Sequence, residues 1–173
     1  MKNVKSISLF LITLILVLLF TGCDSKSTSE VNKDIAKYLH DYIVEELENG
    51  IYPVDACFVS NGILYVETNE DITSVYLLQR DLCYVLDENG KPIKDSGGAV
   101  PMKYDVKVEG DIFTIVNIEM AESGSEYLKS LEEIFPAIAL NKIKNYPDSQ
   151  LQKELEKDLQ RQIKEKYPDI EFE

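Results

Sequence analysis

The sequence predicts an α+β domain in which an N-terminal helix packs on a curled antiparallel meander sheet and further helices follow. Two changes in the hydrophobic period lead to this fold class. Apolar residues recur every three or four positions up to about residue 48, alternate with polar residues from Tyr52 to Met120, and return to helical spacing after Ser123. Because short turns and no helices separate the strands, neighbouring strands are expected to pair antiparallel.

The first helix is expected from Ser29 to Glu48, with Asn49-Gly50 as its left-handed stop. Residues spaced by three and four form one apolar stripe on it: Ile35, Tyr38, Leu39, Tyr42, Ile43 and Leu47. Tyr38 and Tyr42 are therefore interpreted as core residues. His40, the single histidine, lies beside the stripe, where a surface or boundary position is favoured over a role as base or ligand.

Five strands are expected after this helix: Val54–Ser60, Ile63–Thr68, Ser74–Leu86, Val100–Val108 and Ile112–Met120. Asn61-Gly62 is a hairpin signal between the first two strands. A long polar loop is predicted from Asp87 to Gly98. Its start matches only part of a calcium loop and lacks the later acidic ligands, so we interpret it as a turn and predict no metal site.

Arg80 lies on the otherwise apolar face of the strand Ser74–Leu86, and a buried arginine needs a partner. A twist or bulge of the strand at this point is favoured over an anion-binding arginine.

The last hairpin allows two registers. A two-residue turn at Glu109-Gly110 would pair Val108 with Asp111, whereas a three-residue loop places both apolar rows on one face. We predict the three-residue loop, because a shift by one residue would turn every side chain over. It pairs Val108, Val106, Tyr104 and Met102 with Ile112, Thr114, Val116 and Ile118, in that order.

Three helices are expected at the C-terminus. A capping box at Ser123–Glu126 begins a short helix that ends near Pro136, and Pro136 begins a second helix that ends at Tyr146-Pro147. Asp148 or Ser149 caps the third, a helical extension over residues 148–166, whose narrow stripe is Leu151, Leu155, Leu159 and Ile163. Packing of this extension along the domain is favoured over protrusion toward a partner helix.

Residues 1–22 have the organisation of an export signal, with Lys2 and Lys5 before an apolar run from Ile7 to Phe20. The run is shorter than the roughly 20 residues that a spanning helix needs. Phe20-Thr21-Gly22-Cys23 resembles the lipobox of bacterial lipoproteins, in which the cysteine sulfur receives a diacylglycerol. The alternatives are an ordinary secretory signal and a membrane-anchoring helix.

The lipobox resemblance implies that acyl chains such as palmitate hold Cys23 at the extracytoplasmic face of the cell membrane. Residues 23–30 would then be a lipid-anchored tether, and residues 31–173 a single domain. The net charge of −13 would become −15 with the loss of Lys2 and Lys5. Such a charge repels nucleic acid, which is therefore not an expected partner.

Lipidation of Cys23 would leave Cys57 and Cys83 as an even pair in an exported protein. A disulfide and two separate thiols are both open at this point. A nucleophile pair of either cysteine with His40 lacks a third residue to orient it.

The element order is similar to that of a cystatin-like roll, in which the sheet wraps the first helix. Gly97–Pro101, the hairpin Val108–Asp111 and Gly124–Pro136 together resemble a segment of uncharacterised small lipoproteins of Gram-positive bacteria. They are also similar to extracytoplasmic domains attached to membrane metallopeptidases of the beta-lactam-sensor type. The chain has no HExxH motif, so the resemblance implies fold and compartment without peptidase chemistry.

The sequence therefore predicts a non-enzymatic envelope lipoprotein, without a cofactor, that binds or modulates a protein or cell-wall partner. An alternative is an envelope hydrolase that uses strand carboxylates, for which Asp81, Asp105 and Glu119 are the candidates. A third alternative is an immunity protein or a structural spacer. No oligomeric state is predicted.

Overall fold

The computed structural model describes residues 28–50, 54–146 and 149–168. The chain divides into two compact units between Lys33 and Asp34, and only the start of one helix of the first unit lies within the described ranges. The predicted export signal 1–22 and the lipidation site Cys23 are outside these ranges. The first described helix begins at Thr28, one residue before its predicted start, so it includes the last three residues of the predicted tether.

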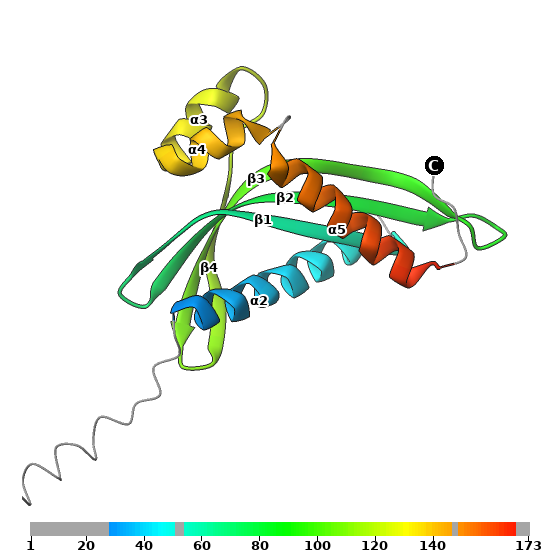
Figure 1. Cartoon of the computed structure of the whole chain (residues 1–173), viewed down its shortest axis with the longest axis horizontal. Helices are drawn as coiled ribbons and strands as arrows, with labels where there is room; N and C mark the ends of the chain where they lie inside the picture. The colour runs from blue at the N-terminus through cyan, green and yellow to red at the C-terminus, as the bar shows by residue number, and fades with distance from the viewer. Residues whose placement is uncertain (1–27, 51–53, 147–148, 169–173) are drawn as a thin grey trace, which may run out of the picture. The chain divides into compact units, whose positions relative to one another are not determined.

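The second unit has the predicted α+β class, with a helix, a meander sheet and C-terminal helices in that order (Figure 1). The sheet is antiparallel with the strand order β1-β2-β3-β4. The elements are α2 (Thr28–Glu48), β1 (Ala56–Asn69), β2 (Ile72–Leu86), β3 (Pro92–Glu109), β4 (Ile112–Met120), the 3₁₀ turn η1 (Gly124–Glu126), α3 (Tyr127–Ile134), α4 (Ala137–Lys144) and α5 (Gln150–Lys166).

One face of the sheet is covered by α2. The centre of its predicted stripe is fully buried at Ile35, Leu39 and Ile43. Beside it, the Tyr38 ring lies 5.8 Å from the Phe113 ring of β4. Tyr42 remains partly exposed. The helix is therefore attached to the sheet by aliphatic side chains, with tyrosines along its margins.

The opposite face is covered by the C-terminal helices, because successive residues of a strand point to opposite sides. Tyr76 and Leu78 of β2 share a core with α3 and α4, whereas Tyr84 packs with Leu159 and Ile163 of α5. Ser149 caps α5 by accepting a hydrogen bond from the Gln152 backbone at 3.2 Å. Helix α5 packs along the sheet, which is the arrangement that the sequence favoured over protrusion. Ser123 makes no side-chain cap, so the predicted capping box is not formed.

The predicted hairpin at Asn61-Gly62 is wrong, because β1 runs through both residues as one strand. A Cβ atom on Gly62 would lie only 2.7 Å from Cδ1 of Leu151. This glycine therefore permits close approach of α5 to the strand rather than a turn. The actual turn follows Asn69, which pairs with Ile72, and the ladder has a bulge between Ile63 and Tyr65.

The predicted loop Asp87–Gly98 is correct only in its first part. Asp87 Oδ1 accepts hydrogen bonds from the backbone of Asn89 at 2.9 Å and of Lys91 at 2.8 Å, which makes a tight turn. From Pro92 onward the chain is strand β3, and Gly97 and Gly98 pair with β2. The cross-strand ladder overrides the turn preference of this polar, glycine-containing segment.

Neither predicted register of the last hairpin is observed. Glu109 pairs with Ile112 across a Gly110-Asp111 turn, in which Gly110 has a φ of 65°. A bulge opposite Asp105 and Val106 then shifts the ladder by one residue, so that Tyr104 pairs with Ile118 and Met102 with Met120 instead of Val116 and Ile118. A bulge thus reconciles a two-residue turn with apolar pairing, a combination that a regular ladder does not allow.

Candidate functional site

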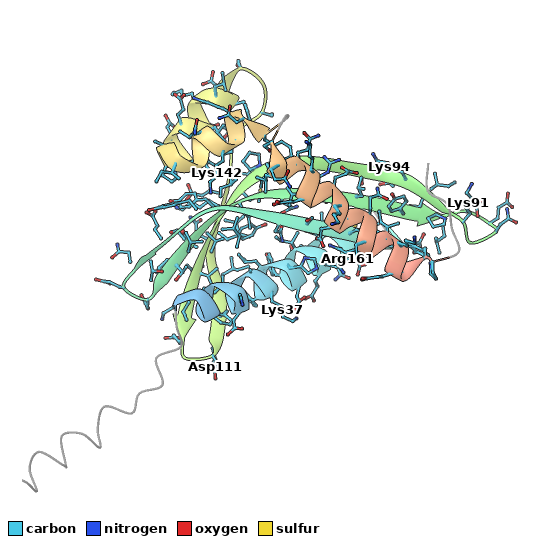
Figure 2. The ribbon with its side chains drawn as sticks, viewed as in Figure 1. Lys37, Lys91, Lys94, Asp111, Lys142 and Arg161 are labelled. Atoms are coloured by element: carbon cyan, nitrogen blue, oxygen red, sulfur yellow. A yellow bond between two sulfur atoms is a disulfide. The ribbon has the colours of Figure 1, made fainter. Side chains whose placement is uncertain are left out.

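A cavity of about 280 Å³ lies at the β1 edge of the sheet, bordered by α2, β1, β2 and α5. Its apolar lining comes from Leu39, Ile63, Val75 and Leu77. This volume is close to the lower end of the roughly 300–1,000 Å³ range of small-molecule sites. Figure 2 shows the two bordering helices, with Lys37 labelled on α2 and Arg161 on α5.

The polar lining comes from three elements. Lys37 and His40 project from α2, Ser60 and Asn61 from β1, and Asp158 from α5. Ser60 and Asn61 are consecutive in a strand and so point to opposite faces. Both can line one cavity because β1 is an edge strand, and the cavity reaches around that edge.

The amide of Asn61 is the least satisfied group in this lining. Both Nδ2 and Oδ1 are buried, and neither has a hydrogen-bond partner among the described residues. A buried amide without partners costs roughly 1–3 kcal/mol for each unsatisfied group. Such a group calls for an explanation in a native fold. Because both atoms are covered in this structure, a ligand with one donor and one acceptor would satisfy the amide once the side chain turns toward the cavity.

Asp158 is held ionised at the α5 side of the cavity. Burial raises the pKa of its carboxyl, but hydrogen bonds from Arg161, Ser60 and Gln162 outweigh burial and lower the pKa overall. Arg161 Nη2 lies 2.6 Å from Oδ1, and Gln162 Nε2 lies 2.8 Å from Oδ2. Ser60 is 4% exposed, and its hydroxyl donates a hydrogen bond to this carboxylate.

His40 is partly buried, at the boundary expected from the sequence, and it lines the cavity. Sequence reasoning missed the cavity because its residues come from four segments between positions 36 and 158. The one available signal was polarity, since Ser60 and Asn61 interrupt an otherwise apolar strand. That signal was interpreted as a turn.

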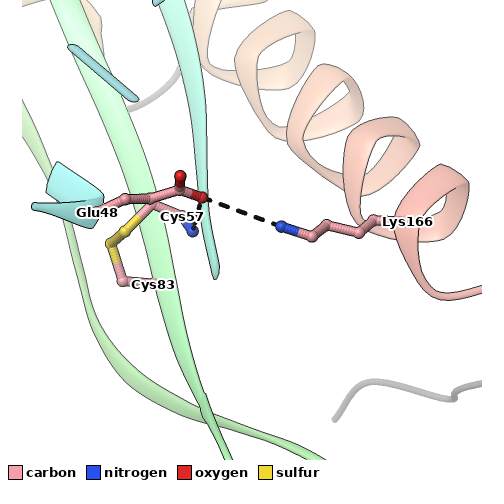
Figure 3. The surroundings of a disulfide bond; sticks show 4 residues. All are labelled: Glu48, Cys57, Cys83 and Lys166. Atoms are coloured by element: carbon pink, nitrogen blue, oxygen red, sulfur yellow. Dashed lines mark hydrogen bonds and ion pairs between the residues drawn. A yellow bond between two sulfur atoms is a disulfide. The ribbon is translucent and has the colours of Figure 1, made fainter. Parts of the chain in front are cut away.

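A disulfide joins Cys57 and Cys83, which face each other directly in the β1–β2 ladder (Figure 3). Both cysteines are buried, at 5% and 4% exposure. Nearby, Glu48 at the end of α2 accepts from the Cys57 backbone at 3.5 Å and lies 3.9 Å from Lys166 Nζ of α5. The disulfide therefore lies where the ends of α2 and α5 meet the start of β1.

Arg80 is not in a bulge, and its guanidinium is paired with a carboxylate at Nη2, whereas Nε is buried without a partner among the described residues. It pairs in regular register with Ser60 and Ala99, and its Nη2 lies 2.5 Å from Oε2 of Glu156 on α5. The predicted bulge at this position is therefore wrong. The partner that the buried arginine requires comes from a helix 76 residues later, which no local pattern could indicate.

The three candidate carboxylates do not come together in one cavity. Glu119 and Asp105 both contact Lys103 Nζ, at 2.7 and 3.2 Å. Burial raises the pKa of Asp105, but bonds from Ser74, Asn117 and Lys103 outweigh it, so the pKa is lowered. Both carboxylates are thus tied to a lysine on the sheet surface.

Asp81 lies apart from the other two carboxylates. The β2 residue opposite Asp105 is Ser74, seven positions from Asp81, which is about 23 Å along the strand and on the other face. Burial raises the pKa of Asp81. Within the described ranges, no group of three or more His, Cys, Asp or Glu side chains is arranged to hold a metal ion.

Comparisons with known protein families, with curated proteins and with solved structures give no match to this chain. In the part of the chain that the structure describes, no helix is both long and apolar enough to span a membrane.

Proposed function

We propose that the protein is a non-enzymatic binding domain, attached through Cys23 to the outer face of the cell membrane, that recognises a protein or cell-wall partner. The observation that carries the binding part is the cavity in which both polar atoms of the Asn61 amide are buried without partners. The anchor rests on the lipobox-like sequence Phe20–Cys23. Together they support the proposal of a recognition site held near the membrane surface.

The lining of the cavity favours a ligand with an amide group. An amide offers one donor and one acceptor side by side, which is the complement of the Asn61 side chain. The fixed Asp158 carboxylate adds a negative charge, and the apolar lining accommodates a short hydrocarbon portion. Lys37 lies at the exposed rim, where its ammonium is paired with Asp41. Both exposed protein loops and cell-wall peptides carry amide groups.

The hydrolase alternative loses its sequence argument, because Asp81 is separated from Asp105 and Glu119 and the latter two are paired with Lys103. An immunity protein would also be a binding domain, so it differs from the main proposal only in its partner. A structural spacer would have no need for a cavity with an unsatisfied amide.

Attachment is tested by fractionating cells that produce the wild type or Cys23→Ala. We expect wild-type protein in the membrane fraction with an intact mass that includes a diacylglycerol, and loss of that mass and location in the variant. An unmodified Cys23 in the membrane fraction would contradict the anchor.

Binding is tested by affinity capture with the full chain in detergent, from solubilised membranes in one arm and from digested cell wall in the other. Asn61→Val removes the amide, and Asn89→Val is the matched control, since Asn89 is exposed in the turn between β2 and β3 and does not line the cavity. We expect one arm to yield a partner that Asn89→Val retains and Asn61→Val loses. Equal capture by both variants would exclude the cavity as the binding site.

A further inference from the structure

The two edges of the sheet are finished in different ways. At the β1 edge, side chains of the helices donate hydrogen bonds to backbone carbonyls of the strand. Gln162 Nε2 donates to Val59 O at 2.8 Å, and Lys142 Nζ donates to Leu64 O at 2.6 Å. Ile63 is the one large apolar side chain of β1 that is strongly exposed, at 40%. This edge is closed against further strands by α4 and α5.

The β4 edge has the opposite character. Four of its nine residues are large, apolar and at least 41% exposed: Ile112, Val116, Ile118 and Met120. The strand contains no proline or lysine, and its single charged residue, Glu119, is paired with Lys103. Proline and lysine are common means of blocking an edge strand, and a long apolar edge strand without them is a template for pairing.

The surroundings of β4 are acidic. Residues 103–126 contain six acidic side chains against two lysines, and Lys103 and Lys107 are both already in ion pairs with neighbouring carboxylates. Glu122 and Glu126, which follow the strand, are exposed. A second copy of this chain would bring the same negative charge to the edge, whereas a basic segment would be attracted.

We propose that β4 is a docking edge for an extended segment of a partner protein, which alternates apolar residues with Lys or Arg and adds to the sheet beside β4. Backbone hydrogen bonds along β4 supply the affinity in this mode of recognition. Specificity comes from apolar contact with Ile118 and Met120 and from basic residues opposite the acidic surroundings. The surface is separate from the cavity at the β1 edge, so the proposal does not depend on the cavity function.

The probe is a synthetic peptide of alternating valine and threonine, matched to the 9 residues of β4 and flanked by lysines. Its binding to the full chain in detergent is measured by fluorescence anisotropy. We expect binding about tenfold tighter than that of the same peptide flanked by glutamates, a preference that weakens with added salt. A proline at the centre of the lysine peptide should abolish binding, because it removes a backbone donor.

Two variants locate the site. Ile118→Asp should weaken binding of the lysine-flanked peptide at least tenfold, whereas Ile93→Asp changes an even more exposed isoleucine on β3 and should leave binding unchanged. Hydrogen exchange of the wild type with and without peptide avoids any effect of substitution on folding, and we expect added protection confined to residues 112–120.

Three results would overturn the proposal. The first is equal binding of both flanked peptides, and the second is absence of added protection at β4. The third is a concentration-dependent dimer that Ile118→Asp disrupts, which would assign the edge to a second copy of the chain.

Discussion

Replacement of Asn61 by valine is expected to stabilise the protein. The structure buries both polar atoms of this amide without partners, and removal of unsatisfied polar groups recovers roughly 1–3 kcal/mol. Valine also suits a strand position better than asparagine by up to about 1 kcal/mol. Since Asn61 lies within the regular part of the β1–β2 ladder, opposite Gln79, the backbone needs no adjustment.

The assay is urea unfolding followed by circular dichroism. With an m value of about 2 kcal/mol per molar urea, the midpoint should rise by roughly 0.5–1.5 M without a change in m. Asn117→Val is the control, because Asn117 Nδ2 donates to Asp105 at 3.1 Å and to Glu119 at 3.0 Å, and loss of these bonds should lower stability by about 1 kcal/mol.

A loss of stability in Asn61→Val of 1 kcal/mol or more, as large as in the control, would refute the reasoning. It would mean that the amide is well satisfied in the free protein. The expected result would show instead that the fold retains a destabilising residue in the cavity, which is characteristic of a binding position.

Three further substitutions test the rest of the structure. Loss of the disulfide, by reduction or in the double variant Cys57→Ala/Cys83→Ala, should lower the free energy of unfolding by about 3 kcal/mol. This value is the loop-entropy estimate for the separation of 26 residues, and thermal unfolding with and without reductant measures it. Leu159→Ala, at 0% exposure, should cost about 2–5 kcal/mol in urea unfolding, whereas Leu128→Ala, at 64% exposure, should be nearly neutral. Burial raises the pKa of Tyr104 to about 12, so the unfolded chain loses this proton at lower pH than the folded protein does. Stability should therefore fall as pH rises from about 10 toward 12, and Tyr104→Phe should make the fall less steep; an unchanged slope would show that Tyr104 does not contribute.

Periodicity was sufficient to predict the fold class and most element boundaries. The centre of the α2 stripe and most of the α5 stripe proved to be buried, because a helix that covers a sheet must carry such a stripe, whereas Tyr38 and Tyr42, which were predicted to be core residues, are only partly buried. The α+β class followed from the change of period alone. These features depend on residues close together in the sequence, which is why they could be predicted.

Two of the errors have a common physical origin, since in both a local signal was overridden by a residue distant in the sequence. A side chain at position 62 would collide with Leu151, which explains the glycine there. Arg80 is tolerated on the helix-covered face of β2 because Glu156 forms an ion pair with it. The cavity could not be predicted for the same reason, as Asn61 and Asp158 come together only in the folded domain. Turn and bulge signals describe the chain before these contacts exist.

The helix side chains that cap the β1 edge are synthesised well after β1 itself. Gln162 and Val59 are 103 residues apart, and Lys142 and Leu64 are 78 apart. The first strand thus emerges from the ribosome long before the residues that protect it, and contacts of such long range form slowly. A chain that ends before α5 would leave this strand able to join other chains. Truncation near residue 149 should therefore produce aggregates rather than a smaller folded domain.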